Sequence, residues 1–235
     1  MEHHDYLLKA IELCRQTKYK EALPFFDKTL ELIPTHPEAL YSKAKALAKL
    51  DQLEESLQHF DLLVEHHGNN AHYISERAVL LFVMGENKKA MTDFDRSLEM
   101  EPSNPYRHSS RAFAKERMGD LKGALADYKK AHELDPEDAI ILNNMGLVEE
   151  KLGYLEQSKN SFAKADKIEG VDLEKVKNSE IKTASDQNPV ADTNESVNQK
   201  KMTFNYFKET LSELFSSKTA RREFLNFLFS KKSNN

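Results

Sequence analysis

The residues best suited to metal or thiol chemistry are nine histidines and one cysteine. His3 and His4 are adjacent in the chain, as are His66 and His67. Consecutive side chains point about 100° apart on a helix, so neither pair forms a ready metal site. Cys14 has no second cysteine with which to form an internal disulfide. We interpret the histidine pairs as solvated surface residues and Cys14 as a packing residue.

Motifs for other kinds of catalysis are missing from the sequence. It contains no glycine-rich phosphate loop, no His-Glu-x-x-His metalloprotease motif and no nucleophile elbow. We therefore expect no catalytic site, no cofactor and no bound metal, and we predict that the protein is not an enzyme.

Composition and charge exclude several further classes of protein. Of the 235 residues, 39% are hydrophobic and 31% are charged, which is typical of a soluble globular chain. The net charge of -5 argues against a dedicated nucleic-acid binder. No stretch approaches the roughly 18 to 20 apolar residues of a membrane-spanning helix, and the amino terminus lacks the pattern of a secretory signal. We expect a cytoplasmic protein.

Glycine and proline recur with a fixed spacing along most of the chain. Gly85, Gly119 and Gly153 stand 34 residues apart, and so do Pro34, Gly68, Pro102, Pro136 and Gly170. This period divides residues 3–172 into five repeats without insertion or deletion. The repeats are 3–36, 37–70, 71–104, 105–138 and 139–172.

Residues at the same place in successive repeats, here called a column, share physical properties. Two columns hold only small residues, and a third holds only aromatic rings. The small columns are Ala10, Ala44, Ala78, Ala112, Gly146 and Ala22, Ser56, Ala90, Ala124, Ser158; the aromatic column is Phe26, Phe60, Phe94, Tyr128, Phe162. Small residues predict the crossing of two paired helices. The rings predict a filled wedge between each repeat and its successor.

Each repeat is therefore predicted to be a helix, a tight turn and a second helix. The turns are expected at Thr17, Asp51, Gly85, Gly119 and Gly153. These columns resemble the tetratricopeptide repeat (TPR), whose signature is small, small and aromatic residues at these offsets and a closing proline. The resemblance covers residues 3–172 and implies an all-α fold, a right-handed α-solenoid of antiparallel helix pairs. It also implies a concave groove lined by the first helix of every pair.

The first helices depart from the usual pattern of the family. Lys9, Lys43, Arg77 and Arg111 replace the usual leucine before the small residue, and we expect them to alter the charge of the groove. Some members of the family bind acidic chaperone tails with a clamp of lysine, asparagine and arginine. In the three windows of consecutive repeats, the matching places hold Leu7, Ile11, Ser42, His72, Glu76; Tyr41, Lys45, Glu76, Tyr106, Ser110; and Ser75, Val79, Ser110, Ile140, Asn144. None carries the clamp.

The groove implied by the resemblance is lined mainly by apolar residues. They are Val79, Phe82, Val83, Tyr106, Phe113, Ile140 and Leu147, with Asn143 and Asn144 beside them. Such a surface suits an amphipathic helix or an extended apolar peptide of a partner protein. The alternative is that several of these rings pack between neighbouring helices, because periodicity does not separate the two cases.

The chain after the repeats changes composition twice. Residues 173–182 are expected to form a short helix that covers the last repeat, and residues 183–199 to be a disordered polar linker. Residues 200–235, the tail, have a net charge of +5 and two apolar stripes at helical spacing. The predicted contact residues of the tail are Phe204, Phe207, Leu211, Phe224 and Leu228.

Two functions remain open at this point. The first is a non-catalytic interaction scaffold whose groove binds a protein or peptide and is autoinhibited by the tail. Residues 1–172 carry a net charge of -8, so the basic tail has an acidic surface to dock on, either in its own chain or in a second copy. The alternative is a peripheral membrane adaptor that uses the basic amphipathic tail. Glu209, Glu213 and Glu223 argue against the membrane because anionic lipid would repel them.

Overall fold

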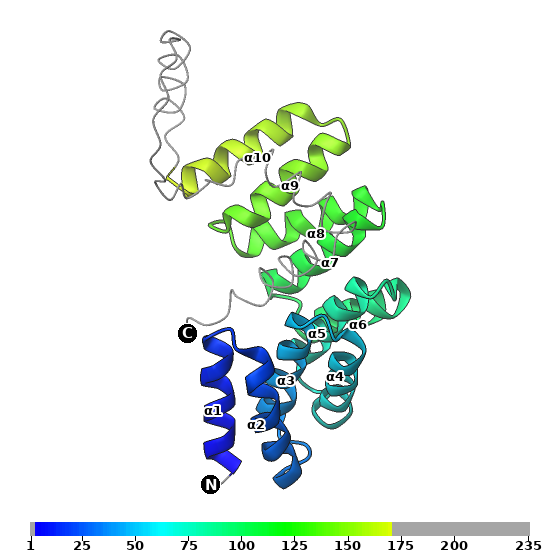
Figure 1. The fold of residues 1–235 in the computed structure, drawn as a ribbon. Coiled ribbons are helices and arrows are strands. Elements are labelled where there is room, and N and C mark those ends of the chain that lie inside the picture. Colours follow the sequence, from blue (N-terminus) through cyan, green and yellow to red (C-terminus); the bar gives the residue numbers. More distant parts are fainter. Residues whose placement is uncertain (1–2, 171–235) are drawn as a thin grey trace, which may run out of the picture. The chain divides into compact units, whose positions relative to one another are not determined.

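The computed structural model describes residues 3–170, and within this range it contains ten α-helices and no strand. The predicted all-α fold is confirmed. Figure 1 shows the helices in chain order, each first helix followed by an antiparallel second helix. Their bounds are α1 (His3–Arg15), α2 (Tyr19–Leu32), α3 (Pro37–Lys49), α4 (Leu53–His67), α5 (Ala71–Val83), α6 (Asn87–Met100), α7 (Pro105–Arg117), α8 (Leu121–Leu134), α9 (Ala139–Lys151) and α10 (Leu155–Ile168). The predicted capping helix 173–182, linker 183–199 and tail 200–235 lie outside the described residues.

The turn inside each repeat depends on one residue in the left-handed region of backbone space. This residue has a φ of 59° at Thr17, 63° at Asp51, 82° at Gly85, 88° at Gly119 and 80° at Gly153. All five stand at the predicted turn positions. A left-handed residue ends a helix because it redirects the chain while the last carbonyls still find donors. The second helix can therefore fold back against the first after only three residues outside the helices.

The small columns lie where the two helices of a repeat cross. Ala44 and Ser56 are both fully buried, and the Ser56 hydroxyl donates a 2.8 Å hydrogen bond to the Ala44 carbonyl. The crossing in the last repeat leaves no room for a side chain at the first small position. A β-carbon on Gly146 would lie 2.8 Å from the ring of Phe162, closer than real contacts allow. Glycine at this place lets the two helices approach with the ring between them.

The aromatic column fills the core between successive repeats. Phe26 packs among residues of α1, α2 and α3, Phe60 among those of α3, α4 and α5, and Tyr128 among those of α7, α8 and α9. Each of these rings is fully buried, and Phe94 is 2% exposed. Phe162, in the last repeat, is only half-buried. This confirms the predicted wedge, since the last ring is the least covered.

The outer face of α10 differs from the corresponding face of α8. On α8, Leu125 is 7% exposed and belongs to the core with α9. One repeat later, the same place holds Lys159, which is exposed. Two apolar residues of α10 are also exposed: Leu155 has 58% of its surface exposed and Ile168 has 36%. At this place α10 is therefore more polar than α8.

The contacts divide the described helices into two compact units. The first unit holds α1 to α6, and the second holds α7 to α10. Each has its own buried core of alanine, leucine and aromatic side chains. The sites below are therefore built within one unit at a time.

Candidate functional site

The first helices of the second unit carry most of the predicted groove residues. Polar caps fix where these helices begin: the Asn104 side chain accepts a hydrogen bond from the Tyr106 amide at 3.0 Å. The Asp138 carboxylate accepts one from the Ile140 amide at 2.8 Å. An N-cap satisfies amides that have no partner inside the helix. Tyr106 and Ile140 therefore occupy matching places in the first turns of α7 and α9.

One stripe of α9 combines apolar and amide side chains. Ile140, Asn143, Asn144 and Leu147 follow one another within two helical turns, at i, i+3, i+4 and i+7, so they share a helix face. Ile140, Asn143 and Asn144 are half-buried, whereas Leu147 is only 6% exposed. Each asparagine amide offers two donors and one acceptor, the groups that a peptide backbone needs. The stripe therefore offers apolar and amide contacts and carries no charged side chain.

The structure separates the nine predicted groove residues into two groups. Val79, Phe82 and Leu147 are buried, with 5%, 7% and 6% of their surfaces exposed. Val83 packs against the core of α3, α4 and α5, and Phe113 against the core of α7, α8 and α9. These five residues therefore follow the alternative in which apolar side chains pack between helices. The other four, which are half-buried, are Tyr106, Ile140, Asn143 and Asn144.

A polar network on α3 and α5 was missed as a unit by the sequence reasoning. The Tyr41 hydroxyl accepts a 3.0 Å hydrogen bond from Lys45 and lies 3.0 Å from Nε2 of His72. The other ring nitrogen of His72 lies 3.8 Å from the buried carboxylate of Glu76. The available signal was spacing: Tyr41 with Lys45 and His72 with Glu76 are each four residues apart on a predicted helix. What joins the two pairs is the contact between α3 and α5.

Lys49 lies one turn beyond Lys45 on α3 and is only 9% exposed. Burial, followed by the like charge of Lys45, lowers the pKa of Lys49 to about 7. Burial removes water from an ammonium group and so disfavours its charged form. The charged form of the Lys49 side chain on α3 is therefore disfavoured.

The basic column requires a correction. The sequence reasoning assigned it to the charge of the groove, but Lys43, Arg77 and Arg111 pair with carboxylates of second helices, whereas Lys9 is exposed. Lys43 lies 2.6 Å from Asp27, Arg77 binds Asp93 and Asp61, and Arg111 binds Asp127. The side chains reach sideways between helices because the place they occupy lies next to the second helices. Aspartates spaced by 34 residues, Asp27 with Asp61 and Asp93 with Asp127, were the signal.

The predicted surface histidines and the thiol form no candidate metal site within residues 3–170. No group of three or more histidine, cysteine, aspartate or glutamate side chains there could hold a metal ion. In one of the two histidine pairs, Nε2 of His67 lies 3.0 Å from the carbonyl oxygen of Thr35, within hydrogen-bond distance. Burial raises the pKa of the Cys14 thiol to about 11, so it is a poor nucleophile near neutral pH. Between α1 and α10, none of the helices is both long and apolar enough to cross a membrane.

Comparison with protein families decides what the repeats are. Tetratricopeptide repeat models match residues 13–80, 117–153 and 139–172. The chain is a TPR protein. The family assignment made from the small and aromatic columns is thereby confirmed, and with it the repeat character of the fold.

Solved structures with the same fold include several TPR proteins. MamA from Desulfovibrio magneticus RS-1 has a TM-score of 0.64 at 19% identity, covering 71% of this chain and 94% of its own. YrrB, described as a TPR protein with an unusual peptide-binding site, has a TM-score of 0.57 at 20% sequence identity. The match covers 74% of this chain and 90% of the YrrB chain. TTC0263, a thermophilic TPR protein of Thermus thermophilus, has a TM-score of 0.58 at 22% sequence identity. The match covers 78% of this chain and 98% of the TTC0263 chain. At these identities the likeness shows the fold alone, and no curated protein matches the chain.

Membership of the family gives a general expectation of function. TPR proteins are generally non-catalytic scaffolds for protein–protein interaction, and they bind protein or peptide partners. In this TPR protein, four half-buried groove residues lie on first helices: Tyr106 on α7, and Ile140, Asn143 and Asn144 on α9. The polar network on α3 and α5 also lies on first helices. The predicted tail contacts Phe204, Phe207, Leu211, Phe224 and Leu228 lie outside the described residues.

Proposed function

We propose that this TPR protein is a non-catalytic scaffold that binds an apolar helical or extended peptide along α7 and α9. The observation that carries the proposal is the half-buried set Tyr106, Ile140, Asn143 and Asn144. Elsewhere on the first helices, apolar groove candidates pack into cores, so their surface is already used. These four keep part of their surface for a partner.

The chemistry of these four side chains indicates the kind of peptide that they would bind. Ile140 supplies an apolar contact and Tyr106 a ring, and aromatic rings bury large areas at low entropic cost. Asn143 and Asn144 supply amide groups that pair with backbone N–H and C=O groups, and so favour no particular side chain. A peptide with apolar side chains on one face, and no requirement for charge, fits this combination.

The tail of the same chain is proposed to compete for partner binding. It carries Phe204, Phe207 and Leu211 at helical spacing, and its charge of +5 is opposite to the -8 of residues 1–172. Tethering gives a segment an effective concentration of roughly millimolar, enough to occupy a surface that binds only weakly in solution. A partner would then have to displace the tail. A cytoplasmic location remains a prediction.

The test is to select peptides and map where they bind. A displayed library of random peptides is selected on the full chain carrying Phe204→Asp and Phe207→Asp, which weaken the predicted tail contacts. The recovered peptides are titrated by calorimetry against this protein and against the same protein with Ile140→Asp or Asn143→Ala/Asn144→Ala. We expect apolar peptides whose affinity falls at least about 10-fold with each of the α9 changes.

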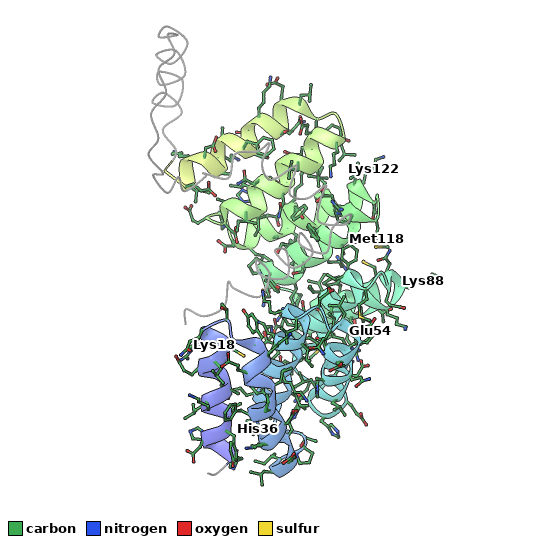
Figure 2. All side chains as sticks on the ribbon, in the orientation of Figure 1. Lys18, His36, Glu54, Lys88, Met118 and Lys122 are labelled. Carbon is green, nitrogen blue, oxygen red and sulfur yellow. The ribbon has the colours of Figure 1, made fainter. Side chains whose placement is uncertain are left out.

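The matched control is Lys122→Glu, because Lys122 is exposed in the first turn of α8 and projects away from the chain (Figure 2). It should leave peptide affinity unchanged. Peptides that bind equally well to the Ile140→Asp protein would place binding elsewhere. Recovery of no apolar peptide would count against the scaffold at this stripe.

A further inference from the structure

The C-terminal ends of the second helices in the first unit lie side by side. Nε2 of His67, the last residue of α4, lies 3.0 Å from the carbonyl oxygen of Thr35, just beyond α2. Arg96 of α6 donates a 2.8 Å hydrogen bond to the carbonyl of Gly68, just beyond α4. Matching places on α2, α4 and α6 therefore form a row across three successive repeats (Figure 1).

This row carries exposed apolar side chains. Leu32 at the end of α2 is 58% exposed, and Met100 at the matching end of α6 is 38% exposed. On α4, Leu62 lies one turn before the matching place and is also 38% exposed. Within residues 3–101, Leu8 is the only other large apolar side chain that is at least 36% exposed. Contiguous exposed apolar side chains are typical of interaction surfaces.

A column of carboxylates runs beside these apolar side chains. Glu31, Glu65 and Glu99 hold one place on α2, α4 and α6, and all three are exposed. Among the described residues, none of the three forms an ion pair. Their negative charge is therefore available to a basic partner. We call the two sets together the end row: Leu32, Leu62, Met100, Glu31, Glu65 and Glu99.

The chemistry of the end row fits a helix that is both apolar and basic. Two basic side chains near the ends of α2 and α6 have contacts of their own. Lys28 lies 5.2 Å from the centre of the Tyr6 ring, and Arg96 binds the Gly68 carbonyl. They therefore do not neutralise the glutamates through ion pairs. A helix with an apolar face and flanking cations would bury apolar surface here and pair with the carboxylates.

The last part of the tail, residues 219–232, has this composition. It carries Phe224 and Leu228 four residues apart, so they share one face of the predicted helix. Its one acid is Glu223. Two pairs of basic residues flank the apolar stretch, about 14 Å apart along such a helix. They are Arg221, Arg222, Lys231 and Lys232.

We infer that residues 219–232 of the tail dock on the end row of the same chain. The apolar face of the segment lies against Leu62 and Met100, and its lysines lie beside the glutamates. Fifty residues separate Gly170 from Arg221, and half that number would span about 80 Å when extended. The length of the chain therefore does not confine this segment to the second unit. This contact does not depend on the competition proposed for the other apolar stripe of the tail.

Zero-length carbodiimide cross-linking of the full chain tests the contact directly. The reagent joins an amine to a carboxylate that touches it, and peptide mass spectrometry identifies the joined residues. We expect links from Lys231 or Lys232 to the glutamates of the end row. The link between Lys43 and Asp27, whose charged atoms are 2.6 Å apart on α3 and α2, is the internal control for reaction and folding.

Variants that keep every reacting group in place separate docking from general attraction between opposite charges. Leu62→Ser/Met100→Ser removes apolar surface from the end row, and Phe224→Ser/Leu228→Ser removes it from the tail. Each pair of changes should reduce the links at least about fivefold, because the apolar contact holds the two charged sets together.

The matched control is Leu8→Ser/Leu155→Ser. It makes the same kind of change at two exposed leucines, on α1 and α10, that do not belong to the end row. It should leave the links unchanged.

Three results would overturn the inference. The first is the absence of these links while the Lys43 to Asp27 link forms. The second is links that the apolar variants leave unchanged, or that the control variant reduces as much. The third is links found only between isotopically light and heavy chains in a mixture, which would assign the contact to a second copy. Peptide affinity at Ile140 is measured separately, so the proposed scaffold can stand if this contact fails.

Discussion

Arg77 offers the most demanding test of the packing, because it joins three helices. Its guanidinium donates two hydrogen bonds to Asp93 on α6, at 2.7 and 2.9 Å, and one to Asp61 on α4, at 2.9 Å. Burial lowers the pKa of Arg77, but the hydrogen bonds and charges of Asp93 and Asp61 outweigh this effect and raise it above its ordinary value. The perturbation is Arg77→Leu, which restores the residue usual in the family.

The two ion pairs of Arg77 are expected to contribute very differently to the free energy of unfolding, because their carboxylates differ in exposure. The Asp93 side chain is 7% exposed, and removing the partner of a buried charge costs about 3 to 5 kcal/mol. The Asp61 side chain is 57% exposed, so solvent screens its pair and the expected contribution is about 0.2 to 1 kcal/mol. We therefore expect Arg77→Leu to cost about 3 kcal/mol or more, and Asp61→Asn less than about 1 kcal/mol.

A second variant separates loss of attraction from the burial of an unpaired charge. In Arg77→Leu/Asp93→Leu, both charges are replaced by apolar side chains. Replacing a buried ion pair in this way is often neutral or stabilising. The double variant should therefore recover to within about 1 kcal/mol of the parent protein.

The assay is native-state hydrogen exchange of the full chain, combined with urea unfolding followed by circular dichroism. Exchange of amides in α5 and α6 reports the local free energy of opening, which a single global transition of a repeat protein does not resolve. A cost below about 1 kcal/mol for Arg77→Leu would refute the reasoning. So would equal losses for Asp61→Asn and Asp93→Asn, since the difference in burial would then have no effect.

Two further predictions concern the aromatic column and the acid limit of stability. Phe94→Ala should cost about 3 to 5 kcal/mol because the ring is 2% exposed, whereas Phe26→Ala should cost less because a terminal repeat frays more easily; urea unfolding compares them. Burial and the charge of Lys43 lower the pKa of His59, whereas the charge of Asp27 raises it. The net effect lowers the pKa of His59 to about 4. As pH falls from its ordinary pKa of 6.5 to about 4, the unfolded chain gains a proton that the native chain does not, so about 1 to 2 kcal/mol of stability should be lost. His59→Gln should flatten that slope, and an unchanged slope would assign it to other groups.

Much of the fold could be predicted because each repeat meets the same local requirements. A left-handed turn residue, a small residue at the crossing and a ring at the wedge recur every 34 residues, as Gly85, Ala78 and Phe94 illustrate. These requirements are set within one repeat and its neighbour, so the order of residues shows them directly. The family assignment followed from the same columns.

The candidate site was predicted less completely, because helical spacing does not say how far away the next helix lies. Val79, Phe82 and Leu147 share a predicted face with Ile140 and Asn143, yet the first three are buried and the other two keep exposed surface. Exposure depends on the side chains of neighbouring helices, which pattern along one helix cannot contain. The sequence therefore named the face but not which of its residues remain available to a partner.

The sequence by itself determined the period, the helix pairs, the turns and the membership of the TPR family, since all of these depend on neighbours in the chain. Only the tertiary structure decided that Arg77 binds Asp93 and that Tyr41 meets His72, because these partners lie 16 and 31 residues apart. Charged and polar side chains are long and can satisfy their charge in several directions. Which direction they take is set by the nearest opposite group in space, and that group is brought there by the packing of helices.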